Sequence, residues 1–206
     1  MRGEAGSAAA PRVYYGMRPI HVQCTLAALL IALLAACATQ QPAEVAKIDR
    51  VLSLIQQRLA IADDVARNKW GSGAPIEDLP REREIIEGLA DQAARYGLAP
   101  VIARDFFRAQ IEASKIIQHA RFREWRAAGQ PKFEKVRDLG RQIRPELDAL
   151  TPALMTALAD AMPVLRAPGA AAIVSARAVV IVTGVPADAP ARETAVAPLE
   201  RVSSAR

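Results

Sequence analysis

Cysteine, histidine and aromatic residues are all scarce in this 206-residue chain. It contains two cysteines and two histidines, and Phe, Trp and Tyr together make up only 4% of the residues. No cluster of His, Cys and carboxylate residues has the spacing of a metal site, no glycine-rich phosphate loop follows a predicted strand, and no nucleophile elbow is present. The sequence therefore gives no sign of a metal centre, a phosphate-loop nucleotide site or a serine-hydrolase site, and we predict no cofactor.

The shortage of aromatics also bears on the fold class. Hydrophobic residues still make up 51% of the chain, and alanine is abundant among them. This balance favours packed helices over a β-sandwich, in which β-branched and aromatic residues are enriched. The length is sufficient for one domain with a real core.

The charge pattern limits the kinds of partner. The net charge is +5, but basic and acidic residues are interspersed through the middle of the chain. A nucleic-acid-binding protein concentrates its positive charge on one face or in a tail, so we predict no nucleic-acid partner. An anionic small molecule remains compatible with this charge.

The N-terminal segment has the pattern of a targeting signal. Residues 25–36 form an apolar run, TLAALLIALLAA, that is too short to span a bilayer comfortably, and it leads into LAAC at 34–37. Small residues before a cysteine resemble the lipobox of a bacterial lipoprotein. The resemblance implies a signal peptide over 1–36 and lipidation of Cys37. Ala38 then favours an anchor in the outer membrane, facing the periplasm of a Gram-negative bacterium. An ordinary secretory signal with an incidental cysteine is the alternative.

These assignments remove both cysteines from the mature fold. Cys24 lies in the predicted signal and Cys37 carries the lipid, so no disulfide is predicted and the fold must rest on packing. Residues 37–42 form a short tether. Residues 43–166 form the predicted domain, and residues 167–206 form a C-terminal extension that packs on it.

Apolar residues recur at helical spacing along most of the mature chain. We predict an all-α fold: a single-domain bundle of long, kinked helices with the functional site inside the bundle. Residues 170–185 contain a β-branched run that fits either a strand or a buried helical turn. The expected helices cover 43–70, from an N-cap at Asp78 to Tyr96, 100–128, 133–165 with interruptions at Pro145 and Pro152, and a short terminal helix over 188–202.

Ser114 and Gln118 form a polar pair on the third predicted helix. They are four residues apart and so lie on one face, among apolar neighbours. A buried amide or hydroxyl without a partner costs about 1–3 kcal/mol. Either the pair bonds to neighbouring helices, or it bonds to a molecule that enters the bundle.

Several charged residues can face the same space. Arg58 and Lys69 are 11 positions apart, which places them within about 20° of each other around a helix axis. A snorkelling arginine on the apolar stripe is the alternative for Arg58, and an N-cap without further function is the alternative for Asp78. The remaining candidates are Arg81 and Glu82 in the first turn of the second helix, and Arg144 before Pro145.

Taken in order along the chain, these residues resemble a known pattern. The succession Arg58…Lys69, Pro75-Ile-Glu-Asp78, Arg81-Glu82 and Gln110-Ile-Glu-Ala-Ser114…Gln118 is similar to that of the all-helical chorismate mutases, and more narrowly to their exported single-domain branch. The resemblance covers about residues 45–159. It implies an enzyme that rearranges chorismate to prephenate in aromatic amino acid biosynthesis, without a cofactor. The family commonly forms dimers, so a homodimer stays open.

The resemblance also implies a role for each matching residue. Arg58, Arg81 and Arg144 correspond to arginines that grip the two carboxylates of the substrate, and Lys69 and Gln118 to donors that hydrogen-bond its ether oxygen. The catalytic set is thus Lys69, Gln118 and Arg58. The other substrate-binding positions are Asp78 and Glu82, toward the hydroxyl, and Ser114.

Two features separate this chain from parts of the family. Gln118 replaces the glutamate of some relatives and donates at any pH, which predicts a flat activity profile through neutral pH. Pro145 is expected to hold Arg144 in an extended conformation. A non-catalytic helical lipoprotein that binds an anionic small molecule or a protein is the alternative function, although such a remnant would be expected to have lost Lys69 or Gln118. A purely structural bundle would point these polar groups outward.

Overall fold

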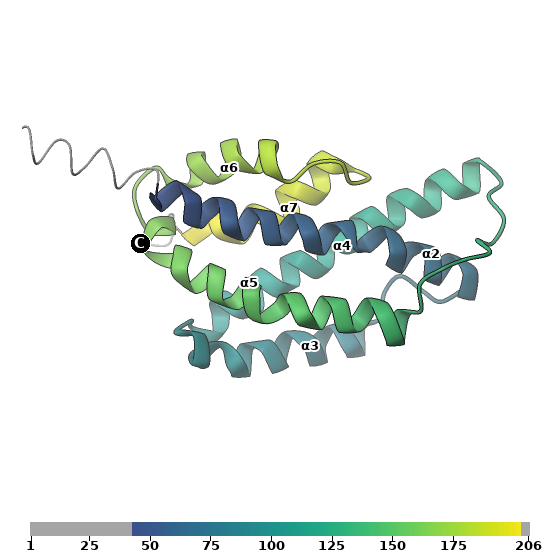
Figure 1. Cartoon of the computed structure of the whole chain (residues 1–206), viewed down its shortest axis with the longest axis horizontal. Helices are drawn as coiled ribbons and strands as arrows, with labels where there is room; N and C mark the ends of the chain where they lie inside the picture. The colour runs from purple at the N-terminus through teal and green to yellow at the C-terminus, as the bar shows by residue number, and fades with distance from the viewer. Residues whose placement is uncertain (1–42, 203–206) are drawn as a thin grey trace, which may run out of the picture. The chain divides into compact units, whose positions relative to one another are not determined.

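The computed structural model describes residues 43–202, which form a bundle of helices (Figure 1). No strand occurs among them, so the all-α class is confirmed. Residues 43–60 are helical, Ile61 forms a turn, and helix α2 continues over Ala62–Ser72. The carbonyl of Ile61 still accepts the N–H of Val65 at 3.1 Å. The predicted long first helix is therefore confirmed, with one local break.

Helix α3 (Leu79–Gln92) begins where the sequence predicts. The side chain of Asp78 caps it by accepting the backbone N–H of Arg81 at 3.3 Å. The helix tightens into the 3-10 helix η1 (Ala93–Tyr96) and stops at Gly97, which has the left-handed φ of 72° that glycine adopts without strain. Both predicted ends of this helical segment are therefore confirmed. They could be predicted because a cap depends on residues only a few positions away.

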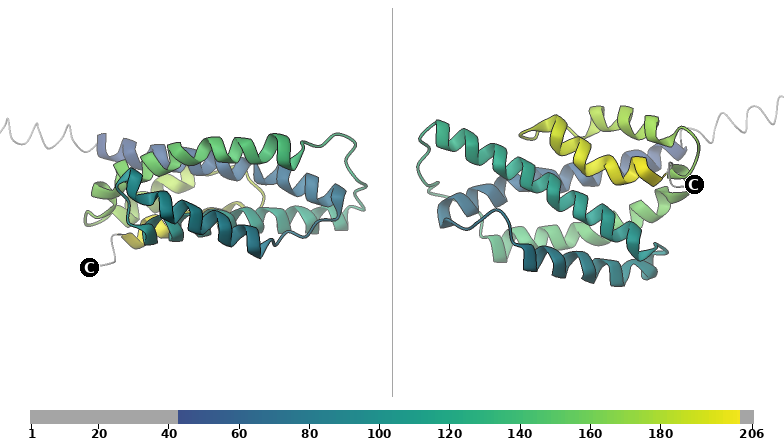
Figure 2. Two further views of the ribbon diagram at one scale, coloured as in Figure 1. Left: turned by 90° about the horizontal axis from the view of Figure 1, so that it is seen from below. Right: turned by 180° about the vertical axis from the view of Figure 1, so that it is seen from behind.

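Helix α4 (Pro100–Ala127) is 28 residues long and lies at the centre of the bundle. It packs against α2, α3 and the C-terminal helix α7 (Asp188–Val202), as the two views of Figure 2 show. Phe106 and Phe107 are buried on it, with their rings edge to face at 5.2 Å. The core is therefore built around α4, the helix that carries the polar pair.

The fourth helical region starts later than predicted. Residues 131–138 are not helical, and a π-helical turn, η2 (Leu139–Ile143), precedes helix α5 (Arg144–Leu165). Tertiary contacts hold the connecting segment, since the carbonyl of Arg137 accepts the amide of Asn68 at 2.9 Å. These contacts join residues far apart in the sequence, so local patterns do not reveal them.

Arg144 corrects a second prediction. It has helical torsion angles, φ −61° and ψ −45°, instead of the extended conformation expected before Pro145. Its N–H donates to the carbonyl of Leu139, five residues earlier. A proline ring clashes with the carbonyl four residues before it in a regular helix, and the wider π turn provides a different local geometry at that point. Arg144 is thus placed on a helix, facing the interior of the bundle.

The C-terminal region is helical throughout its described part. The β-branched run that left strand and helix open belongs to helix α6 (Ala170–Ile181), and α7 confirms the predicted terminal helix. Both helices contribute side chains to the main core, among them Val174 and Leu199. The buried amide of Gln110 donates to the carbonyl of Ala195 at 2.9 Å and so ties α4 to α7.

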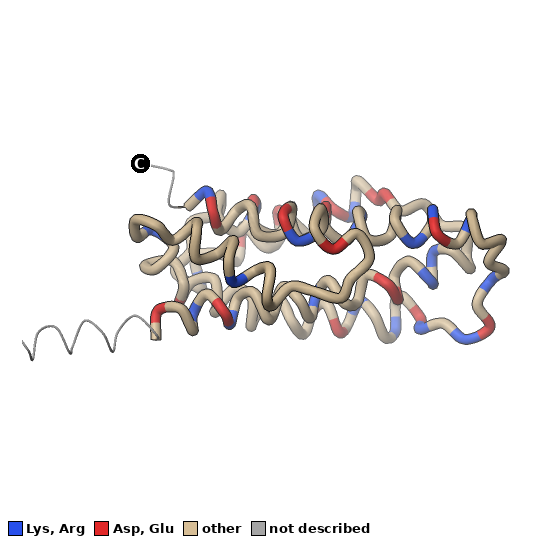
Figure 3. The backbone as a smooth tube through the Cα atoms, turned by 90° about the horizontal axis from the view of Figure 1, so that it is seen from above, with Lys and Arg blue, Asp and Glu red and all other residues tan. Residues whose placement is uncertain are grey.

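Charged residues of both signs are interspersed along the described backbone (Figure 3). Many of them pair, as Arg177 does with both carboxylate oxygens of Asp49 at 2.7 Å. Between residues 43 and 202, no helix combines the length and the apolarity that crossing a membrane requires. The predicted signal peptide and Cys37 lie outside the described residues.

Candidate active site

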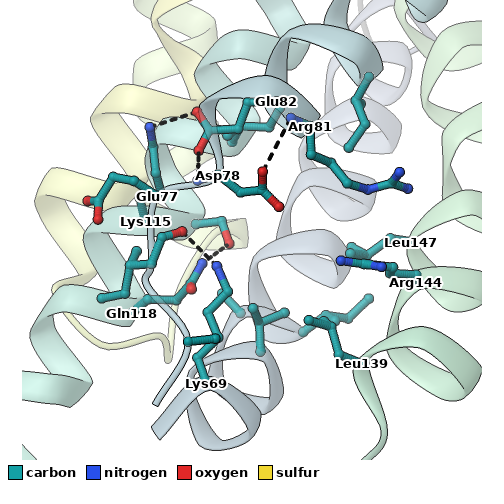
Figure 4. Close-up of a pocket in the computed structure, with 18 of the residues that line it drawn as sticks. Lys69, Glu77, Asp78, Arg81, Glu82, Lys115, Gln118, Leu139, Arg144 and Leu147 are labelled. Carbon is teal, nitrogen blue, oxygen red and sulfur yellow. Dashed lines mark hydrogen bonds and ion pairs between the residues drawn. The ribbon is translucent and has the colours of Figure 1, made fainter. Parts of the chain in front are cut away.

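A cavity of about 720 Å³ lies within the bundle. Its wall is formed by the end of the first helical stretch, α2, residues 74–78, α3, α4, η2 and α5. In the view of Figure 4, Arg81 and Arg144 extend on one side, and Lys69 and Gln118 lie on the other. All eight predicted site residues line this cavity: Arg58, Lys69, Asp78, Arg81, Glu82, Ser114, Gln118 and Arg144.

Arg58 contributes a buried nitrogen atom to this wall. Its Nε has no hydrogen-bond partner among the described residues. Burial lowers the pKa of Arg58 to about 10, and the nearby carboxylate of Asp148 opposes this shift. The side chain therefore stays charged at neutral pH. A snorkelling arginine would keep its head group in water, whereas a buried donor without a partner favours an acceptor that arrives with a ligand.

The loop that follows α2 holds the side chain of Lys69 in place. Its Nζ donates to the carbonyl of Ile76 at 2.6 Å. An ammonium group has three donors, so up to two remain for a ligand. Burial lowers the pKa of Lys69 and Arg144 adds to this effect, while Asp78, Glu82 and Glu77 oppose it in that order.

The first turn of α3 forms a capping box that faces the cavity. Asp78 accepts the backbone N–H of Arg81, and Glu82 Oε1 reaches back to accept the N–H of Asp78 at 3.1 Å. The guanidinium of Arg81 pairs with the carboxylate of Glu84 at 3.5 Å. That weak, exposed pair leaves the guanidinium available to a carboxylate ligand, which it can bind through two parallel hydrogen bonds.

Ser114 and Gln118 bond to each other across one turn of α4. Gln118 Nε2 donates to Ser114 Oγ at 3.1 Å, while Gln118 Oε1 is buried without a partner among the described residues. A serine hydroxyl both donates and accepts. If the amide rotated by half a turn, Oε1 would accept the hydroxyl and Nε2 would be free to donate into the cavity. The pair is thus compatible with a donor role for Gln118 toward a bound molecule.

Three charged residues of the wall were not among the predicted site residues: Glu77, Lys115 and Asp148. Lys115 follows Ser114 and forms ion pairs with Glu82 at 3.0 Å and Glu112 at 2.7 Å. Asp148 lies one helical turn after Arg144 on α5 and also lines the cavity. The spacing of four residues from Arg144 was a usable signal for Asp148, because such residues share a helix face. Lys115 gave no signal, since its partner Glu82 is on another helix.

The side chains that line the cavity do not form a metal site. No group of three or more His, Cys, Asp or Glu side chains between residues 43 and 202 is arranged to hold a metal ion. The cavity instead combines five basic and four acidic side chains with neutral hydroxyl and amide groups. Its guanidinium and ammonium groups can bind the negative groups of a small organic molecule.

Together, these features define an all-helical protein with an internal cavity lined by charged side chains of both signs. Residues 42–119 match the family model described as chorismate mutase type II. Two solved structures are similar to this chain. The chorismate mutase from Burkholderia phymatum is 30% identical with a TM-score of 0.71, and the alignment covers 76% of this chain and 98% of that one. The chorismate mutase from Burkholderia thailandensis is 35% identical with a TM-score of 0.69, covering 74% and 98%.

A curated relative has the same family name. The secreted chorismate mutase of Mycolicibacterium smegmatis is 34% identical over 112 residues, which are 54% of this chain and 61% of the relative. The match thus spans about three-fifths of the relative's own length. The two solved structures are covered almost completely at 30% identity or more. The chain belongs to the chorismate mutase family.

Proposed function

We propose that this protein catalyses the rearrangement of chorismate to prephenate. The reaction breaks a carbon–oxygen bond and forms a carbon–carbon bond within one molecule, so the protein's task is to position a dianion and stabilise charge on the breaking ether oxygen. The observation that carries the proposal is the convergence of Arg58, Lys69, Arg81 and Arg144 on one cavity that also contains Gln118.

Each group has a distinct task in this proposal. The guanidinium groups of Arg58, Arg81 and Arg144 bind the two carboxylates, because a planar fork matches a carboxylate. They select the compact conformer in which the reacting carbons meet. Asp78 and Glu82 face the hydroxyl. The carboxylates of the wall offset most of its positive charge. Its basic residues are Arg58, Lys69, Arg81, Lys115 and Arg144, and its acidic residues are Glu77, Asp78, Glu82 and Asp148.

Lys69 and Gln118 supply the electrostatic stabilisation. As the ether bond breaks, negative charge grows on the oxygen, and donors already aimed at that position strengthen without reorganising. Lys69 is held by Ile76, and Ser114 can hold the rotated amide of Gln118. Ser114 thereby orients the amide in addition to facing a substrate carboxylate.

A chorismate-disappearance assay on the purified protein tests this function. Replacing Lys69 with alanine should lower turnover at least about 100-fold, the scale of losing one preorganised donor. Lys47→Ala is the matched control, because Lys47 is exposed on the first helical stretch and does not line the cavity. Wild-type protein that binds chorismate without converting it would overturn the proposal and favour the non-catalytic binding protein.

We also propose that the protein is exported and anchored by lipid on Cys37 to the outer membrane, facing the periplasm. Two observations support export: the apolar run before a lipobox-like sequence, and the word "secreted" in the name of the similar mycobacterial protein.

A further inference from the structure

Lys115 lies at the junction between the cavity and the start of α3. Its ammonium group contacts Glu82 of α3 at 3.0 Å and Glu112 of its own helix at 2.7 Å. The side chains of Lys115 and Glu82 are only 12% and 16% exposed, whereas that of Glu112 is 48% exposed. The contact of Lys115 with Glu82, marked by a dashed line in Figure 4, is thus less exposed than its contact with Glu112.

Both carboxylate oxygens of Glu82 are engaged in this arrangement. Oε2 accepts from Lys115, and Oε1 accepts the backbone N–H of Asp78 at 3.1 Å. Asp78 in turn accepts the N–H of Arg81. One chain of contacts therefore runs from α4 through Glu82 to the residues that begin α3 and carry Arg81 into the cavity.

The ion pair between Lys115 and Glu82 also affects the charge of the cavity wall. Glu82 places a carboxylate in the wall of a cavity proposed to receive a dianion, and like charges in a partly buried site repel strongly. Burial alone would lower the pKa of Lys115, but its hydrogen bonds to Glu112 and Glu82 outweigh burial and raise it. The ammonium is charged at neutral pH and offsets the charge of Glu82.

We propose that Lys115 is a positioning residue for the reaction: through its ion pair with Glu82 it fixes the capping box of α3, and with it Arg81, for substrate binding. The role rests on the proposed chorismate mutase function. It predicts a loss in substrate binding that exceeds any loss in the chemical step, because Arg81 grips a carboxylate in the ground state and the transition state alike.

The chain offers a matched control for this role. Arg104 and Glu87 also join α4 to α3, with hydrogen bonds of 2.7, 3.0 and 3.2 Å, but neither residue lines the cavity. Arg104→Met and Lys115→Met each remove one ion pair between the same two helices. A merely structural role for Lys115 predicts similar effects of the two substitutions.

The experiment compares kcat, KM and the thermal midpoint of wild type, Lys115→Met, Lys115→Arg and Arg104→Met. Lys115→Met should raise the KM for chorismate about tenfold or more with kcat within about threefold of wild type. Arg104→Met should leave KM unchanged, and Lys115→Arg, which keeps the charge, should recover most of the affinity. Adding Lys115→Met to Glu82→Gln should cost much less than adding it to wild type, because the two residues act as a unit.

Hydrogen exchange provides a readout that does not depend on turnover. Backbone amides at the start of α3, including that of Arg81, should exchange faster in Lys115→Met than in Arg104→Met. An unchanged KM in an active Lys115→Met variant, an equal rise in Arg104→Met, or unchanged exchange at Arg81 would overturn the positioning role. A wild type without mutase activity would instead overturn the proposed function, and the exchange comparison would still test the ion pair.

Discussion

Replacing Gln118 with glutamate should convert a pH-independent donor into a pH-dependent one. Gln118 is only 4% exposed, and its side chain meets Ser114 within the cavity wall. An amide keeps its N–H groups at any pH, whereas a carboxyl group donates only while protonated. In the wild type, we therefore expect turnover to be flat through neutral pH. In the Gln118→Glu variant, turnover should follow the protonated fraction of the new carboxyl group.

The size of the effect follows from two opposing influences on that carboxyl group. Burial raises its pKa, while the ammonium of Lys69, which lines the same cavity, lowers it. With the ordinary pKa of about 4.3, the protonated fraction falls roughly 250-fold between about pH 5 and about pH 7.5. With a pKa raised by burial to about 6.3, the fall over the same interval is roughly 16-fold. Either value is easily separated from a flat profile.

The assay is kcat for chorismate disappearance across this interval, with Gln92→Glu as the control for the same chemical change at an exposed position outside the cavity. If burial dominates at Gln118→Glu, the folded state binds more protons than the unfolded state. Stability relative to wild type should then fall as pH rises from the unfolded pKa through the folded one. A flat kcat profile in Gln118→Glu, or an equally steep one in wild type, would refute the donor role of Gln118.

Further predictions concern Lys69, two glycines and Cys37. The kcat/KM of wild type should fall as pH rises through the lowered pKa of Lys69, because the neutral amine has no positive charge and is a much weaker donor than the ammonium. Lys69→Arg should remove this fall while lowering the rate, and the same alkaline fall in Lys69→Arg would count against the assignment. Gly97→Ala should lower the free energy of unfolding by about 1 kcal/mol because alanine is strained at a φ of 72°. Gly88→Ala, inside α3 with no heavy atom of a distant residue within 4 Å of an added Cβ, should instead raise it by about 0.5–1 kcal/mol in a denaturant titration. Cys37→Ser should move the protein from the membrane fraction to the soluble fraction of fractionated cells, and unchanged fractionation would contradict the lipid anchor.

Most helix boundaries could be predicted because the residues that set them act over a few positions. Asp78 caps α3 through its own neighbours, and Gly97 ends η1 through a torsion angle that most residues avoid. The start of α5 could not be predicted in the same way. Asn68 bonds to the connecting segment before it, and a π turn places Arg144 on a helix despite the proline that follows. In both cases, the deciding contact or geometry overrides the local preference.

The candidate site, too, could be predicted only in part from the sequence. The residue types and their order pointed to Arg58, Lys69, Arg81, Gln118 and Arg144, but their assembly into one site came from resemblance to a family. Spacing alone relates residues only within one helix, as for Ser114 and Gln118.

The sequence by itself thus determined the helical class, most of the caps and the side chains available for binding a small dianion, because periodicity, turn chemistry and charge are written locally. Only the tertiary structure decided that Arg58 keeps a buried nitrogen in the cavity wall, that Glu82 is engaged by Lys115 and that α6 is a helix. Each of these outcomes depends on groups brought together from different helices, and packing selects among the alternatives that local preference leaves nearly equal.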